Sequence, residues 1–122
     1  MSLRTDRVAS LVKEEAGLFI SRELNAPTLG LITVMDVVMT PDLKIAKIYV
    51  SILGSPEVKT ASMASLEDRK GELRSFIGSH LRLKFTPSIQ IYLDETMERV
   101  DKINRLIQQI HKDDGSKPEQ PQ

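Results

Sequence analysis

Two runs of strand-forming residues joined by a short turn constrain the fold of this chain more than any other feature. Residues 31–39 read LITVMDVVM, a β-branched run long enough for one strand, and residues 43–53 alternate apolar with polar side chains. Between them, Thr40-Pro41-Asp42 has turn chemistry, because proline fixes φ at an early turn position. We therefore predict an antiparallel β-hairpin. One face of its second strand carries Ala46, Ile48, Val50 and Ile52.

Helical periodicity precedes the hairpin. Apolar residues recur there at three- and four-residue spacing, as in an amphipathic helix: Val8, Leu11, Val12, Ala16, Phe19, Ile20 and Leu24. Asn25, Pro27 and Gly30 then break the pattern. We predict one helix that ends before the hairpin begins.

A second helical segment follows the hairpin. We predict that it begins between Thr60 and Ser65. Its apolar side consists of Met63, Leu66, Leu73, Phe76, Ile77 and Leu81. Gly71 and Gly78 interrupt this segment, and each costs about 1 kcal/mol relative to alanine in a helix interior. Because sharp bends in helices often occur at glycine, we predict a kink near Gly71.

A third strand and a last helix complete the pattern. Residues 88–93 alternate apolar and polar side chains, and Asp94 is a candidate N-cap for the helix that follows. The predicted buried stripe of that helix is Val100, Ile103, Ile107 and Ile110. The order of elements predicts an α+β fold with a three-stranded sheet packed against helices on one face. Residues 1–112 form one domain in this prediction, and residues 113–122, which include no apolar residue, form a disordered polar tail.

Composition excludes several classes of protein. A length of 122 residues suits one domain, and 40% apolar with 28% charged residues is a globular balance. The absence of cysteine rules out disulfides and thiol catalysis, and it fits a reducing compartment. No run approaches the roughly 20 apolar residues of a membrane span. We expect a cytoplasmic protein that does not bind a membrane.

Catalytic and cofactor motifs are missing from the sequence. His80 and His111 lie far apart along the chain, and neither has an evident carboxylate partner. No GxxxxGK[ST] phosphate loop or GxGxxG turn occurs, and no set of His, Asp and Glu has metal-ligand spacing. We expect no enzymatic activity, no cofactor and no metal.

Positive charge is concentrated in one segment, although the chain as a whole is neutral. Residues 69–84 read RKGELRSFIGSHLRLK and carry five basic residues against one acidic residue. Lysine and arginine neutralise phosphate, and glycine permits close approach of a nucleic-acid backbone. A solvated helix face is an equally good interpretation of this segment. The candidate RNA-binding residues are Arg69, Lys70, Gly71, Arg74, Ser75, Arg82 and Lys84, with Arg4, Arg7, Lys44 and Lys47 as outlying candidates.

Three segments together resemble the ribosome-binding factor A family over about residues 4–110. The chain opens with an Arg-Val helix in RTDRVASLV, continues with the hairpin VVMTPDLKIAKIYVSIL, and closes with GELRSFIGSHLRLKFTPSIQIYLDET. The order and spacing of these motifs carry the resemblance. It implies a KH-like (type II) fold with a helix–kink–helix between the second and third strands. The family's kink is Ala-x-Gly, which corresponds to Arg69-Lys70-Gly71 here, so the glycine is retained and arginine replaces alanine. Sequence leaves open whether the helix bends there or runs straighter.

The resemblance also implies a function. Members of the family bind the immature small ribosomal subunit, assist late maturation of its rRNA, including the 5′ end, and are associated with growth in the cold. Their release is helped by an assembly GTPase. We therefore expect a monomer whose partners are small-subunit rRNA and adjoining ribosomal proteins. The alternative is a protein–protein interaction module without direct RNA contact, which the near-neutral pI favours.

Overall fold

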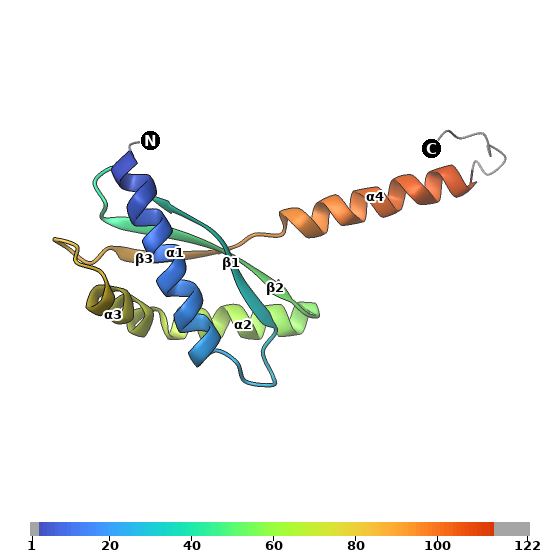
Figure 1. Ribbon diagram of the computed structural model, residues 1–122. Helices are drawn as coiled ribbons and strands as arrows, with labels where there is room; N and C mark the ends of the chain where they lie inside the picture. The colour runs from blue at the N-terminus through green and yellow to red at the C-terminus, as the bar shows by residue number, and fades with distance from the viewer. Residues whose placement is uncertain (1–2, 114–122) are drawn as a thin grey trace.

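The computed structural model describes residues 3–113, including all side chains except those of residues 97, 98 and 111–113. A three-stranded sheet is covered on one face by three helices, and a fourth helix extends away from it (Figure 1). The elements are α1 Leu3–Glu23, β1 Leu31–Met39, β2 Ile45–Leu53, α2 Pro56–Asp68, α3 Lys70–His80, β3 Ser88–Leu93 and α4 Thr96–Asp113. Within this part of the chain, no helix combines the length and apolarity needed to cross a membrane.

The sheet has the order β1-β2-β3, with β1 antiparallel and β3 parallel to the central β2. The predicted hairpin is confirmed. Its second strand begins at Ile45, later than predicted, because the turn continues through Leu43, whose N–H donates to the Thr40 carbonyl at 2.8 Å. The parallel pairing of β2 with β3 requires a long crossover connection, and α2 and α3 provide it.

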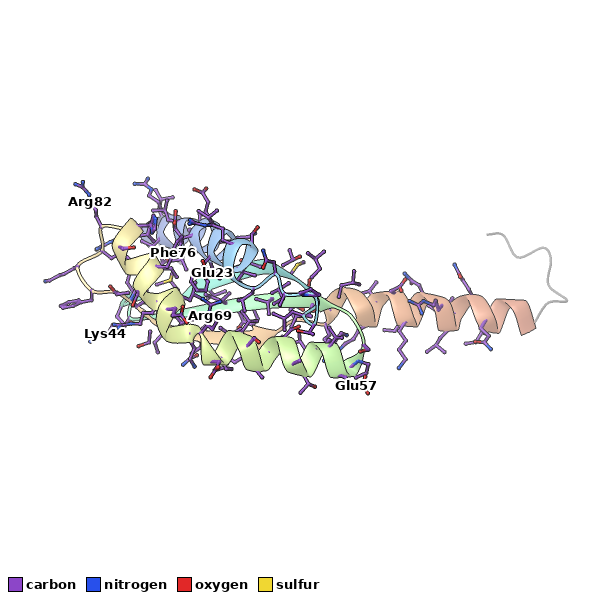
Figure 2. All side chains as sticks on the ribbon, turned by 90° about the horizontal axis from the view of Figure 1, so that it is seen from below. Glu23, Lys44, Glu57, Arg69, Phe76 and Arg82 are labelled. Carbon is purple, nitrogen blue, oxygen red and sulfur yellow. The ribbon has the colours of Figure 1, made fainter. Side chains whose placement is uncertain are left out.

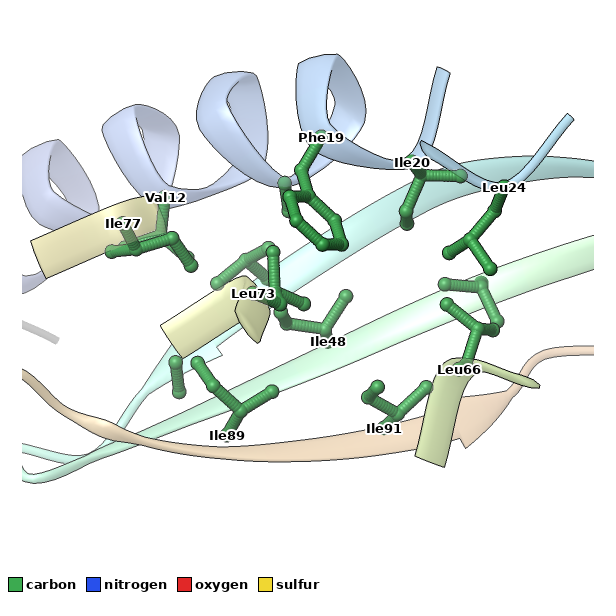
Figure 3. Close-up of a cluster of buried hydrophobic side chains, with 14 of the residues drawn as sticks. Val12, Phe19, Ile20, Leu24, Ile48, Leu66, Leu73, Ile77, Ile89 and Ile91 are labelled. Atoms are coloured by element: carbon green, nitrogen blue, oxygen red, sulfur yellow. The ribbon is translucent and has the colours of Figure 1, made fainter. Parts of the chain in front are cut away.

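The core lies between the sheet and the helices. The predicted face of β2 is buried, and Ala46, Ile48 and Val50 have no exposed surface. Side chains from α1, α2 and α3 pack against it, among them Phe19, Leu66, Leu73 and Ile77 (Figure 3). Leu11 is 41% exposed, so its predicted place in the apolar face of α1 is wrong.

Helix α2 begins at Pro56, four residues before the earliest predicted start. Ser55 caps it, because its hydroxyl accepts the Val58 N–H at 3.2 Å. Proline occupies the first turn, where its missing N–H has no helical partner to lose. The predicted start between Thr60 and Ser65 is therefore too late, because Ser55 and Pro56 form the helix start.

The predicted interruption between strands β2 and β3 is present, and it falls at Arg69. This residue separates α2 from α3 with φ −104° and ψ 15°, values that lie outside the helical range. Gly71 lies inside α3 and does not have positive φ. The break is therefore at Arg69, two residues before the glycine near which the kink was predicted.

We expect Gly71→Ala to stabilise the protein. The backbone at Gly71 is helical, and a Cβ there would meet no atom within 4 Å. Alanine is favoured over glycine in a helix by up to about 1 kcal/mol, and the gain is smaller near a helix end. Urea unfolding of the parent and the variant measures the difference. A lower midpoint for the variant would contradict this account of the α2–α3 junction.

The described side chains of α4 lie outside the core, which contradicts the predicted buried stripe. Val100, Ile103, Ile107 and Ile110 are 46–60% exposed. Asp94 acts as predicted, since its carboxylate accepts the Thr96 N–H at 2.9 Å and starts the helix. After the connection between β3 and α4, residues 94–95, the helix extends away from the sheet (Figure 1). Helical periodicity shows that a helix has an apolar face, but it carries no information about what covers that face.

Because the described side chains of α4 lie outside the core, we propose that the folding unit ends near Glu95. A chain ending at Glu95 is expected to keep its melting temperature within a few degrees, since no residue of the core cluster is removed. Circular dichroism melting measures this. A loss of cooperative unfolding would show that α4 contributes to the domain. The predicted disordered tail falls outside the described residues except for Asp113, which ends α4.

Candidate nucleic-acid interface

The predicted site residues lie in separate regions of the structure. Arg69, Lys70, Gly71, Arg74 and Ser75 lie in the first half of α3 or immediately before it. Arg82 and Lys84 lie beyond the other end of α3, which at 11 residues is about 16 Å long. Figure 2 shows Arg69 near Glu23 at the α2–α3 junction, whereas Arg82 and Lys44 lie toward the end of the domain away from α4, on opposite sides of it in this view. Arg4 and Arg7 are on α1, and Lys47 is on β2.

At the α2–α3 junction, the Arg69 side chain makes hydrogen bonds that connect two helices. The Arg69 guanidinium donates to the Glu23 carbonyl at 2.8 Å, to the Glu23 carboxylate at 2.9 Å and to both carboxylate oxygens of Glu72. It also lies 5.6 Å from the centre of the Phe19 ring. Hydrogen bonds from Arg69 hold the pKa of Glu72 below its usual range. Arg69 thereby joins the end of α1 to the start of α3.

Lys70 is also paired, with Glu67 at 2.9 Å. The junction therefore brings together two cations and three carboxylates, Glu23, Glu67 and Glu72. This local balance is unfavourable for phosphate, because the attraction of each cation is offset by a nearby anion. Arg69 and Lys70 therefore stabilise the fold through ion pairs, and any contact they make with RNA competes with these ion pairs.

Arg74 positions the loop that follows α3. Its guanidinium donates to the Thr86 carbonyl at 2.9 Å and to the Pro87 carbonyl at 3.1 Å. Helix α3 also approaches this loop closely at Gly78, where a Cβ would lie only 2.7 Å from the Thr86 hydroxyl oxygen. The absence of a side chain at Gly78 allows this contact. The two interactions hold residues 81–87 against α3.

The hairpin turn is joined to the same loop. Leu43 has φ 62°, an uncommon value for a non-glycine residue, and it turns the chain into β2. The Thr40 hydroxyl donates to the Asp42 carboxylate at 2.7 Å, and the Lys44 backbone N–H donates to the same carboxylate at 3.0 Å. These two hydrogen bonds hold the pKa of Asp42 below its usual range. The Lys44 carbonyl accepts the Ser88 N–H at 2.8 Å. Lys44 is thus fixed beside the start of β3.

These constraints bring three predicted cations together. Arg4 from α1, Lys44 from the hairpin turn and Lys84 from the α3–β3 loop line one hollow of about 300 Å³, which we call the cationic hollow. Its other lining residues are Thr5, Pro41, Asp42, Leu43, Leu83 and Phe85. All three cations are exposed, and within the described part of the chain none of them forms an ion pair. With Asp42 as the one carboxylate in the lining, the hollow has an excess of two positive charges.

Charge distinguishes this hollow from larger ones. A hollow of about 490 Å³ between α1 and β1 is lined by Lys13 and Glu14, whose charges cancel. Another of about 580 Å³ near the start of β1 has no charged lining residue. The cationic hollow is therefore the better candidate for binding an anionic ligand. Phe85, which is 66% exposed at its edge, was not among the predicted site residues, although its position directly after Lys84 could have identified it.

The structure gives His80 a carboxylate neighbour that sequence did not reveal. Glu15 Oε1 lies 3.9 Å from His80 Nδ1. The same nitrogen lies 3.1 Å from the Ser79 hydroxyl and 2.8 Å from the Phe76 carbonyl. A Ser-His-carboxylate relay requires the serine and the carboxylate on opposite ring nitrogens, so these three side chains do not assemble one.

The fold defines the class of this protein. A mixed three-stranded sheet with helices on one face, and a two-helix crossover between its parallel strands, is a KH-like domain of the α+β class. Residues 4–107 match the family described as ribosome-binding factor A. The chain belongs to this family.

Solved structures agree with the assignment. The crystal structure of ribosome-binding factor A from Thermus thermophilus is similar with a TM-score of 0.63 and 19% identity, over 73% of this chain and 94% of that one. An NMR structure of a Thermotoga maritima protein, proposed as a ribosome binding factor A, is 30% identical with a TM-score of 0.54, over 74% and 82% of the two chains. A homology model of Thermus thermophilus ribosome-binding factor A, fitted into a cryo-EM map of a complex with the 30S subunit, has a TM-score of 0.62 at 20% identity, over 71% of this chain and 91% of that one.

Proposed function

We propose that this protein binds the immature small ribosomal subunit and assists late maturation of small-subunit rRNA, including processing of its 5′ end. Membership of the ribosome-binding factor A family supports the proposal, as does the similar Thermus protein fitted into a 30S complex. The single observation that carries RNA contact is the cationic hollow, where three segments bring unpaired cations together.

Contacts to RNA centre on Arg4, Lys44 and Lys84 in this proposal. Arg7, Arg82 and Lys47 are further candidates, and Arg69, Lys70, Gly71, Arg74 and Ser75 form an outer set, in which the three cations already make hydrogen bonds within the fold. Structured RNA is recognised largely through phosphate and 2′-hydroxyl groups, which suits lysine and arginine side chains. The protein therefore reads charge and shape more than base sequence.

The remaining parts of the proposal concern the cellular setting. The protein acts in the cytoplasm as a monomer, needs no cofactor and catalyses no reaction of its own. It supports growth in the cold, and an assembly GTPase helps to release it. Its partners on the subunit are rRNA and adjoining ribosomal proteins.

A protein–protein interaction module without direct RNA contact is the second candidate. The exposed apolar stripe of α4 favours it, because isoleucine and valine side chains 46–60% exposed on one helix offer a surface for another protein. Tight, salt-insensitive binding to a ribosomal protein, with poor affinity for rRNA, would select this candidate.

Co-sedimentation with purified subunits tests the first candidate. Immature small subunits are expected to bind the protein better than large subunits do, because the cations are clustered in one place. If three to six phosphates are neutralised, log affinity should fall with log salt at a slope of roughly −2 to −5. Equal binding to large subunits, or no response to salt, would contradict the proposal.

A further inference from the structure

We infer that Phe85 is a stacking platform for one unpaired nucleobase, whose neighbouring phosphates bind Arg4, Lys44 and Lys84. The inference rests on the proposed function and deepens it, because it assigns the RNA element that the cationic hollow receives. An exposed apolar residue is ordinary on a protein surface when it stands alone. Phe85 does not stand alone, since its ring lines a hollow that also contains three cations.

The Phe85 ring and the Lys84 ammonium lie within reach of one nucleotide. Lys84 Nζ lies 5.6 Å from the centre of the Phe85 ring, so a phosphate bound to this lysine leaves its base close to the ring. Two thirds of the Phe85 surface is free, which leaves room for a base on the ring. Positive charge beside an aromatic ring is the combination by which proteins bind unpaired nucleotides. The volume of the hollow, about 300 Å³, is at the lower end of the range for small-ligand sites.

The platform is held in place before any ligand arrives. Immediately after Phe85, the carbonyls of Thr86 and Pro87 accept hydrogen bonds from Arg74. Pro87 is fully buried, and Ser88 donates to the Lys44 carbonyl. Aromatic side chains in such a fixed segment lose little conformational freedom on binding, which favours affinity. This gives Arg74 a positioning role in place of the direct phosphate contact that sequence suggested.

The pair Tyr49 and Tyr92 provides a comparison with Phe85. Tyr49 and Tyr92 stack on one another on the face of the sheet opposite the helices, with ring centres 5.3 Å apart. Lys47, which lies two residues before Tyr49 on the same face of β2, is half-buried. These rings already contact each other, and three exposed cations do not surround them. Tyr92 is therefore a matched control for the loss of an exposed aromatic ring.

The test uses the full chain and a single-stranded RNA decamer, compared with a duplex of the same sequence. Stacking of one base on an aromatic ring accounts for roughly five- to 150-fold in affinity. Phe85→Leu, which keeps an apolar side chain but removes the ring, should weaken decamer binding by at least fivefold and leave duplex binding and the salt slope unchanged. Tyr92→Leu should change neither. Thermal melting of Phe85→Leu should match the parent, because Phe85 is exposed.

Phe85→Trp provides an independent readout. The chain contains no tryptophan, so this variant has one fluorophore, placed at the proposed platform. Its affinity for the decamer should equal or exceed that of the parent, and bound bases should quench its fluorescence. Three results would each overturn the inference: undiminished binding by Phe85→Leu, equal loss of decamer and duplex binding, or no decamer binding by the parent at 50 mM salt. If Phe85→Leu binds RNA and subunits normally, the platform fails while the proposed function stands; if the parent does not bind small subunits, the function itself fails.

Discussion

Lys44→Glu combined with Lys84→Glu is expected to lower the affinity for small subunits by about 100-fold at 0.1 M salt. Each neutralised phosphate contributes about 0.7–0.9 log units at that concentration, so removing two contacts costs roughly 25- to 60-fold, and reversed charge adds repulsion. The salt slope should become shallower by about 1.5–2. Both lysines are exposed and line the cationic hollow, so the fold should remain intact.

A matched variant separates local from overall charge. Arg99→Glu with Lys102→Glu makes the same change in net charge on the exposed surface of α4, away from the hollow. It should retain most of the affinity, and co-sedimentation in a salt series compares the two. Equal losses in both would mean that only net charge matters. Normal binding by the hollow variant would move the RNA site to another predicted residue, most directly to Arg82 or the α2–α3 junction.

Ile48→Ala is expected to cause the largest loss of stability. Ile48 lies in the middle of β2, the central strand, and has no exposed surface. Truncation of a buried isoleucine costs about 2–5 kcal/mol, because apolar surface is lost from the core and a cavity remains. A domain of this size has a total stability of about 5–15 kcal/mol, so the melting temperature should fall by roughly 10 °C or more. Urea unfolding and thermal melting measure the change.

The same substitution on α4 provides the control. Ile103 is 54% exposed, so Ile103→Ala removes the same atoms where they contribute no burial to the core. Its cost should be within about 0.5 kcal/mol of zero, as for most exposed positions. A loss comparable with that of Ile48→Ala would show that α4 packs against the domain. Ile48→Val, which removes one buried methylene, should fall between the two at about 0.5–1.5 kcal/mol.

The strands were predictable because strand formation here has local signals. Strand β1 covers Leu31–Met39 and β3 covers Ser88–Leu93, as predicted, since β-branched alternation and flanking turn residues lie within a few positions of each other. The start of α2 was missed although Ser55 and Pro56 form a recognisable cap. That error was one of interpretation, because the signal is present in the sequence.

The site was only partly predictable. All three cations of the hollow were among the candidates, but the sequence grouped Lys84 with Arg69 and left Arg4 and Lys44 as outliers. The structure reverses this grouping, because α3 separates Arg69 from Lys84, and the hydrogen bond from Ser88 to Lys44 brings the hairpin turn to the loop. Phe85 was not predicted as a site residue, because its relevance depends on its lying beside Arg4, Lys44 and Lys84 in the folded protein.

By itself, the sequence determined the order of the elements, the apolar face of β2 and the presence of an amphipathic α4, because periodicity and turn chemistry act over a few residues. Only the tertiary structure decided that Arg69 is committed to Glu23 and Glu72, that the stripe of α4 is exposed, and that Arg4, Lys44 and Lys84 converge. These outcomes depend on how the fold places residues as many as 80 positions apart, such as Arg4 and Lys84, which line one hollow. The burial of a side chain and the pairing of charges depend on which residues lie close together in the folded chain, and the local sequence pattern does not encode this.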